Sequence, residues 1–138
     1  MQATGTLVAA LDDDLRAQTD IDFQVYDTLL HVFEAGDSGI QMTELAREIV
    51  LSKAGLTALI DRLDKRSLVQ RVPDPDDRRA VRIKLTEQGE KIFRSAARIH
   101  LTGIRERVLQ HLTDDEARVI AEAFERVRLA NAGPTRRT

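Results

Sequence analysis

The sequence predicts a mostly α-helical fold that carries one small β-hairpin. Apolar residues recur at helical spacing over most of the 138 residues, whereas apolar and polar residues alternate clearly only at Val81, Ile83 and Leu85. Four phenylalanines, one tyrosine and three prolines make a composition that favours helices over a β-sandwich. With 42% hydrophobic and 32% charged residues, the chain is expected to form one globular domain.

The composition also excludes several kinds of site. The absence of cysteine rules out disulfides, thiolate metal sites and cysteine nucleophiles. No apolar run reaches the roughly 18 residues that a membrane-spanning helix needs, and residues 1–6 do not form a signal peptide. We therefore expect a cytoplasmic protein that does not contact a membrane.

Two helices are predicted before residue 36. The first is a short helix over residues 7–16, with Leu7, Val8, Leu11 and Leu15 on one face. The second is predicted by five apolar residues at helical spacing: Phe23, Tyr26, Leu29, Leu30 and Phe33. Residues 36–39, with the sequence GDSG, are a predicted loop.

A closely linked pair of helices comes next, which is the pattern of a helix-turn-helix over about residues 43–66. Thr43 and Ser52 are the predicted N-caps of the two helices. The second helix buries one stripe, formed by Leu56, Leu59, Ile60 and Leu63, and presents Lys53, Thr57, Asp61 and Lys65 on the opposite side. Its first turn has small or hydrogen-bonding side chains, which permit close approach to base edges and phosphates. An ordinary helical hairpin is the alternative.

A β-hairpin is predicted over about residues 68–85. Its strands cover residues 68–72 and 81–85, and the loop between them contains prolines and aspartates that stop regular structure. A hairpin directly after a helix-turn-helix is a wing, and Arg78 and Arg79 on its loop can enter a minor groove. Asp77 is predicted to hold an arginine in an extended pose by a charge-assisted hydrogen bond. An exposed, salt-bridged turn is the alternative.

The charge is unevenly distributed along the chain. The net charge of −2 divides into −8 over residues 1–46, +4 over residues 47–84 and +2 over the rest. A basic segment within a nearly neutral chain fits a face that meets a polyanion. An ordinary solvated surface explains the charge equally well, so the decision depends on local structure.

The last third of the chain is predicted to form two more helices. Thr86 is the predicted cap of a long helix that reaches Leu112, and Thr113–Glu116 is a capping box that opens a final helix through Val127. These helices have more apolar surface than a small winged domain can cover, which predicts a homodimer interface. A self-contained helical bundle is the alternative. Residues 133–138 are a predicted flexible tail.

The central segment resembles a known family. The residues from Met42 to Leu63 are similar to the helix-turn-helix of the multiple-antibiotic-resistance regulator (MarR) family, and those from Asp74 to Gly89 are similar to its wing and following helix. The resemblance implies one MarR-like domain over residues 1–138, with a winged DNA-binding part over 20–86 and dimerisation helices over 1–19 and 87–132. It also implies a homodimeric regulator that binds a pseudo-palindromic operator and is often released by a small ligand. The helix predicted over residues 7–16 is shorter than the first helix of that family.

The predicted DNA-contacting residues lie on the helix-turn-helix and the wing: Thr43, Ser52, Lys53, Ala54, Gly55, Thr57, Ala58, Arg62, Asp77, Arg78 and Arg79. Candidates for an effector pocket are Arg16, Tyr26 and His31, although a partly buried polar tip on a core helix explains His31 as well.

No catalytic or phosphate-loop motif is present, and the histidines have no metal-ligand spacing. We therefore expect no enzymatic activity, no metal and no cofactor. The main hypothesis is a sequence-specific transcriptional regulator, a ligand-responsive repressor, that binds DNA as a homodimer. A winged-helix protein-interaction module that does not bind DNA is the alternative. The ten basic residues within residues 47–84 argue against it, and the acidic first third keeps it open.

Overall fold

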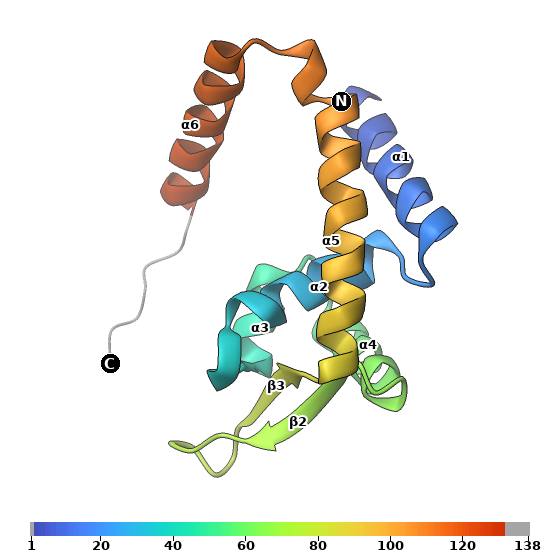
Figure 1. Ribbon diagram of the computed structural model, residues 1–138. Coiled ribbons are helices and arrows are strands. Elements are labelled where there is room, and N and C mark those ends of the chain that lie inside the picture. The colour runs from blue at the N-terminus through green and yellow to red at the C-terminus, as the bar shows by residue number, and fades with distance from the viewer. Residues whose placement is uncertain (1, 132–138) are drawn as a thin grey trace. The chain divides into compact units, whose positions relative to one another are not determined.

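The computed structural model describes residues 2–131, which form α-helices and one small sheet (Figure 1). The helices are α1 (Gln2–Gln18), α2 (Phe23–Glu34), α3 (Met42–Glu48), α4 (Lys53–Lys65), α5 (Glu87–Arg107) and α6 (Asp114–Asn131). The strands are β1 (Ile40–Gln41), β2 (Val69–Pro73) and β3 (Val81–Leu85). The predicted class, mostly helical with a hairpin, is confirmed. The chain divides into two compact units at Leu101 and Thr102. The predicted tail at 133–138 lies outside the described residues.

The first helix is longer than predicted. Helix α1 spans 17 residues, so the expectation of a short helix over residues 7–16 is wrong. The residues before Leu7 are small or polar, and they extend the helix without adding to the apolar stripe that predicted it. Near the end of α1, the Asp12 carboxylate pairs with Arg16 at 2.7 Å and accepts a hydrogen bond from the Phe23 N–H at 2.6 Å. Asp12 thereby joins α1 to the start of α2.

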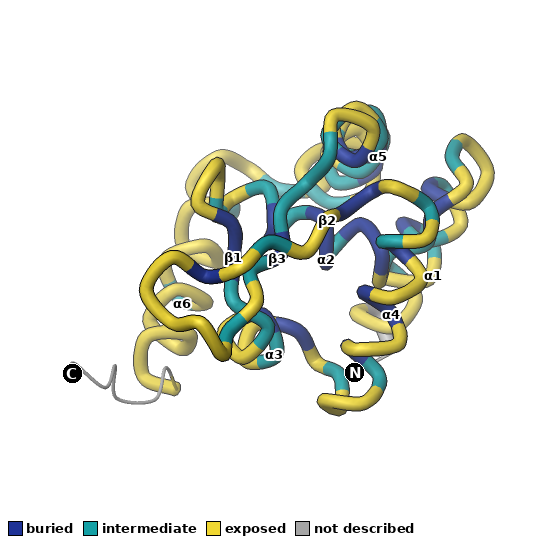
Figure 2. Tube along the Cα trace, turned by 90° about the horizontal axis from the view of Figure 1, so that it is seen from below, coloured by how far each residue is buried: buried dark blue, intermediate teal, exposed yellow. Residues whose placement is uncertain are grey.

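The hydrophobic core lies in the first unit, between α2, α4 and the sheet. The predicted apolar stripe of α4 is confirmed, because Leu56, Leu59, Ile60 and Leu63 are each at most 3% exposed. They pack in one cluster with Leu29 of α2 and with Ile83 of β3. Figure 2 shows buried and exposed stretches alternating along α4, while most of the β2–β3 loop is exposed.

The sheet has a strand that the sequence did not predict. Its order is β1-β3-β2 and all pairs are antiparallel, with Ile40 opposite Ile83 and Gln41 opposite Arg82. Residues 36–39, the predicted loop, form a 3₁₀ turn followed by a glycine. Gly39 has a φ of 68°, and a Cβ there would lie 2.7 Å from the Ile83 carbonyl oxygen. The glycine therefore permits β1 to enter the sheet beside β3.

The start of α5 is fixed against the hairpin. Thr86 caps α5 as predicted, because its hydroxyl accepts from the Gly89 N–H at 2.9 Å. The Thr86 N–H also donates to the Leu68 carbonyl at 3.1 Å. A Cβ at Gly89 would overlap that same carbonyl, so only glycine lets the helix approach the strand so closely.

The predicted end of this helix is wrong. Helix α5 ends at Arg107, and residues Leu109–His111 form a 3₁₀ turn before Leu112 becomes extended. The capping box explains the early end, because the residues that precede an N-cap must leave the helical conformation. The box itself is confirmed: the Thr113 N–H donates to Glu116 at 2.8 Å, and the Glu116 N–H donates to the Thr113 hydroxyl at 3.3 Å.

Candidate nucleic-acid interface

A tight link joins α3 to α4 and fixes the start of α4. The Ile49 backbone is extended at the end of α3, and the Leu51 N–H donates to its carbonyl at 2.8 Å. Ser52 is the N-cap of α4, as predicted, because its hydroxyl accepts from the Gly55 N–H at 3.1 Å. Thr43 is not a cap. Helix α3 begins at Met42, directly after strand β1, and Gln41 occupies the cap position without bonding the helix N–H groups through its side chain.

The first turns of α4 form an open surface. Among the predicted contact residues on this helix, Gly55 is half-buried, and the others are exposed: Ser52, Lys53, Ala54, Thr57, Ala58 and Arg62. Thr43 on α3 is also exposed. The Thr57 hydroxyl donates to the Lys53 carbonyl at 3.0 Å, which fixes its rotamer and leaves its lone pairs and methyl group at the surface. A helix start with small side chains and free backbone N–H groups suits an anionic partner.

Ion pairs divide the basic residues of this region into two groups. Arg71 on β2 binds Asp61 and Asp64 of α4, at 2.5 and 3.1 Å, and so holds the hairpin against the helix. Sequence analysis missed this role of Arg71. Other cations have no acidic partner within ion-pair distance in the described part of the chain: Lys53, Arg62, Lys65, Arg78 and Arg79. This second group can pair with phosphates without breaking an internal bond.

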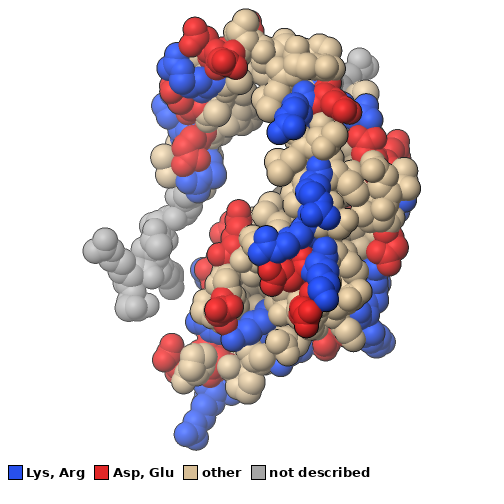
Figure 3. Space-filling view, viewed as in Figure 1, with Lys and Arg blue, Asp and Glu red and all other residues tan. Residues whose placement is uncertain are grey.

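The β2–β3 loop presents two arginines at a tight turn. The Ala80 N–H donates to the Asp77 carbonyl at 2.9 Å, which puts Arg78 and Arg79 at the two central positions of the turn. Both side chains are exposed, and basic side chains protrude at this loop at the lower left of Figure 3. Asp77 does not hold an arginine side chain as predicted. Its carboxylate accepts from the Arg79 backbone N–H at 2.9 Å, because a short aspartate reaches the amide two residues on more easily than a guanidinium.

Asp74 at the base of this loop is a site residue that sequence analysis missed. It is 3% exposed, and its carboxylate accepts from Gln41 Nε2 and Arg82 Nε, both at 2.6 Å. It also accepts from the backbone N–H groups of Asp76 and Asp77, at 2.8 and 3.0 Å. These hydrogen bonds, the one from Gln41 most of all, hold the pKa of Asp74 well below its usual range. An aspartate before a proline predicts a turn in which the carboxylate accepts from backbone N–H groups that follow it. It does not predict the partners from β1 and β3.

Comparison with known proteins agrees with this arrangement. The sequence model of the MarR family matches residues 19–80, which include α2, α3, α4 and most of the hairpin. The chain is 36% identical over 93 residues to the HTH-type transcriptional regulator YsmB of Bacillus subtilis, covering 67% of this chain and 62% of that relative. The chain belongs to the MarR family.

Solved structures extend the likeness to nearly the whole chain. The MarR family regulator Sco3205 from Streptomyces coelicolor, in complex with DNA, has a TM-score of 0.84 and 26% identity over 97% of this chain and 83% of that one. A mutant of Escherichia coli MarR, complexed with operator DNA, has a TM-score of 0.78 and 25% identity, covering 91% and 88%. The chain spans 62%, 49% and 52% of the length of three curated HTH-type transcriptional regulators that it matches.

The residues predicted for an effector pocket do not come together in this MarR-family chain. Arg16 pairs with Asp12 and, at 3.5 Å, with Asp22, and it lines a groove between α1 and α2. Tyr26 is 6% exposed and packs on Phe93 and His100, with ring centroids 5.9 and 4.7 Å apart. His31 lies 3.8 Å from Asp27 on the same helix. The three-residue pocket stays a prediction that this geometry does not support.

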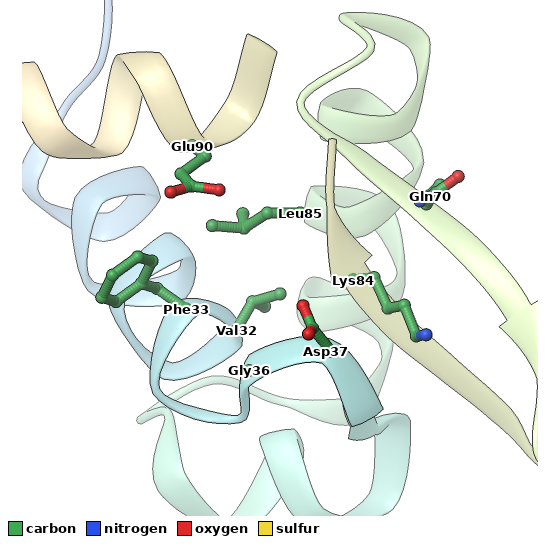
Figure 4. A pocket seen from close by; sticks show the side chains of 8 residues that line it. All are labelled: Val32, Phe33, Gly36, Asp37, Gln70, Lys84, Leu85 and Glu90. Atoms are coloured by element: carbon green, nitrogen blue, oxygen red, sulfur yellow. The ribbon is translucent and has the colours of Figure 1, made fainter. Parts of the chain in front are cut away.

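A different cavity opens beside the sheet (Figure 4). It measures about 530 Å³, and its lining comes from α2, the turn at Gly36–Ser38, β2, β3 and α5. Phe33 and Leu85 supply apolar surface, while Asp37, Lys84 and Glu90 supply charges of both signs. None of the predicted effector residues lines it.

Within residues 2–131, no group of three histidine, aspartate or glutamate side chains is arranged to hold a metal ion. The helices of that same range are not long and apolar enough for any of them to cross a membrane.

Proposed function

We propose that this chain is a sequence-specific transcriptional repressor that binds a pseudo-palindromic DNA operator as a homodimer in the cytoplasm. One observation carries the proposal: among the described residues, the exposed cations of α4 and of the β2–β3 turn have no carboxylate partners, whereas Arg71 and Arg82 do. Free cations on a helix start and a protruding turn are what phosphate and groove binding require. The DNA complexes of Sco3205 and of Escherichia coli MarR support the same interpretation.

In this proposal α4 occupies the major groove and the hairpin occupies the neighbouring minor groove. Lys53 and Thr57 face base edges, Arg62 faces a flanking phosphate, and the turn delivers Arg79, with Arg78 beside it, to the minor groove. Residues 20–86 would be the DNA-binding part, with the helix-turn-helix at about 43–66 and the wing at about 68–85. Residues 1–19 and 87–132 would supply the dimer helices.

The second unit supports the homodimer. Helix α6 leaves large apolar side chains exposed, at 71% for Phe124, 58% for Val127 and 56% for Val119. Apolar side chains gathered on one helix mark a contact surface. A second copy of the chain is the occupant that a two-fold symmetric operator requires. Regulation by a small-molecule effector stays a prediction.

The proposal is tested with a duplex selected from a randomised pool, titrated at about 50 mM and about 200 mM salt. A regulator should prefer the selected duplex over its scrambled sequence and should lose affinity steeply as salt rises. Equal affinity for both duplexes would contradict sequence-specific binding. No binding at either salt concentration would favour the protein-interaction module instead.

Thr57→Ala separates base reading from phosphate contact. If Thr57 faces a base, the substitution should change the preference among single-base variants of the duplex by about 1–3 kcal/mol at one position. Thr102→Ala, at an exposed threonine of α5 outside the predicted contact residues, is the matched control and should leave this preference unchanged. A uniform loss of affinity over all variants would show that Thr57 does not read sequence.

A further inference from the structure

A buried carboxylate links three parts of the proposed DNA face. Asp74 lies in the β2–β3 loop, where its neighbours Pro73, Pro75 and Asp76 are all exposed, yet Asp74 itself is 3% exposed. A buried carboxylate is costly unless donors surround it. Here the donors come from β1 through Gln41, from β3 through Arg82, and from the loop backbone.

The two carboxylate oxygens face different parts of the structure. One oxygen, Oδ2, accepts from both Gln41 and Arg82, at 2.6 Å each, and so faces the sheet. The other, Oδ1, accepts from the Asp76 and Asp77 N–H groups and so faces the loop. Asp74 therefore fixes the direction in which the loop leaves the sheet.

The chain of contacts continues to the tip of the loop and to the start of α3. Asp77, whose N–H is held by Asp74, uses its own carboxylate to hold the Arg79 N–H at 2.9 Å. In the other direction, Gln41 is the residue that directly precedes α3, and Arg82 also donates to the Gly39 carbonyl at 3.1 Å. One side chain thus joins the helix-turn-helix to the turn that carries Arg79.

We infer that Asp74 is a positioning residue for DNA binding, which holds the arginine turn at a fixed place relative to α3 without touching DNA itself. The inference rests on the proposed function and adds to it the residues that set the geometry of the wing. Its physical basis is that a pre-ordered turn does not have to be immobilised when DNA binds. The pairing with Arg82 also neutralises a carboxylate that would otherwise repel phosphate.

Asp74→Asn tests the inference, with Asp76→Asn as the matched control. Both substitutions remove one negative charge from the same loop, but only Asp74 is buried and bonded to Gln41 and Arg82. Charge removal by itself should leave DNA affinity unchanged or raise it. We expect Asp76→Asn to leave DNA affinity unchanged or to raise it, and we expect Asp74→Asn to lower DNA affinity about tenfold. This tenfold loss does not exceed the loss expected when the arginine contacts are removed. Equal affinities for the two variants would overturn the inference.

A double substitution with Arg79→Ala separates positioning from general damage. If Asp74 acts through the arginine turn, Asp74→Asn should cost nothing further once Arg79 is absent. The same loss in both backgrounds would overturn the inference. If Asp74→Asn does not fold, Gln41→Met takes its place in the same comparison with and without Arg79→Ala. Gln41→Met keeps the charge of Asp74 and removes one hydrogen-bond donor from its carboxylate.

Trypsin cleavage after Arg78 and Arg79 supplies a readout that needs no DNA. Loss of the Asp74 bonds should speed cleavage at the turn several-fold compared with Asp76→Asn, because proteolysis follows the mobility of the loop. Equal cleavage rates would overturn the inference. If the unaltered chain binds no DNA while the cleavage rates differ, the proposed function fails and the role of Asp74 in fixing the turn stands.

Discussion

Replacing Arg79 by alanine should weaken DNA binding and flatten its dependence on salt. Arg79 lies at the centre of an exposed turn and has no acidic partner among residues 2–131, so its loss leaves no unpaired carboxylate behind. A dimer has two copies of Arg79, so the substitution removes two positive charges from it. Each charge that neutralises a phosphate contributes about 0.9 to the slope of log affinity against log salt, so the slope should fall by about 1.8. When salt rises from about 50 to about 200 mM, the fold-loss of affinity should be about 12 times smaller for the variant than for the unaltered chain.

Fluorescence anisotropy of a labelled duplex at several salt concentrations measures this slope. Arg79→Lys should keep most of the slope, because it keeps the charge. Arg98→Ala, an exposed arginine of α5 whose loss removes the same charge elsewhere, should leave the slope unchanged. Sedimentation should show the same oligomer for all variants. An unchanged slope in Arg79→Ala would refute the assignment of the turn to the DNA face.

Three other substitutions test packing, assembly and pH response. Gly89→Ala should lower the thermal midpoint, since its Cβ overlaps the Leu68 carbonyl and overpacking costs about 1–3 kcal/mol or more; an unchanged midpoint contradicts this contact. Phe124→Asp should turn a dimer into a monomer in sedimentation, because Phe124 is 71% exposed on α6; a persistent dimer contradicts the interface. Burial lowers the pKa of His100, and the nearby charge of Asp27 offsets this lowering only in part. The folded chain therefore favours neutral His100, and its stability is lost as the pH falls below about 6.5. Stability of His100→Gln should therefore fall less between about pH 7.5 and 5.5, and an equal fall contradicts this origin.

The features that could be predicted from the sequence follow local rules. The buried stripe of α4 repeats every three or four residues, and the caps at Ser52, Thr86 and Thr113 act over three residues. Such signals are complete within a few residues of sequence, so reading them requires no knowledge of the fold. The helix-turn-helix and the hairpin were therefore predictable, with errors only at their ends.

The features that could not be predicted depend on contacts between distant residues. Gln41 lies 33 positions from its partner Asp74, and strand β1 has only two residues, too few for an alternating pattern. Thr43 was a reasonable cap by composition, but the pairing of β1 with β3 decides where α3 begins. The loop sequence did not indicate a buried carboxylate, because the burial of Asp74 depends on where Gln41 and Arg82 lie.

The pairing of charges, rather than their sum, determines which surface can bind DNA. Residues 47–84 have a net charge of +4, a modest value that an ordinary surface also shows. The structure pairs Asp61 and Asp64 with Arg71, and it pairs Asp74 with Arg82. These acids are thereby neutralised by cations of the hairpin strands, Arg71 on β2 and Arg82 on β3. Of the cations of this segment that have no acidic partner among residues 2–131, three are exposed on α4 and two on the turn, so the field that a polyanion meets there is more positive than the net charge indicates.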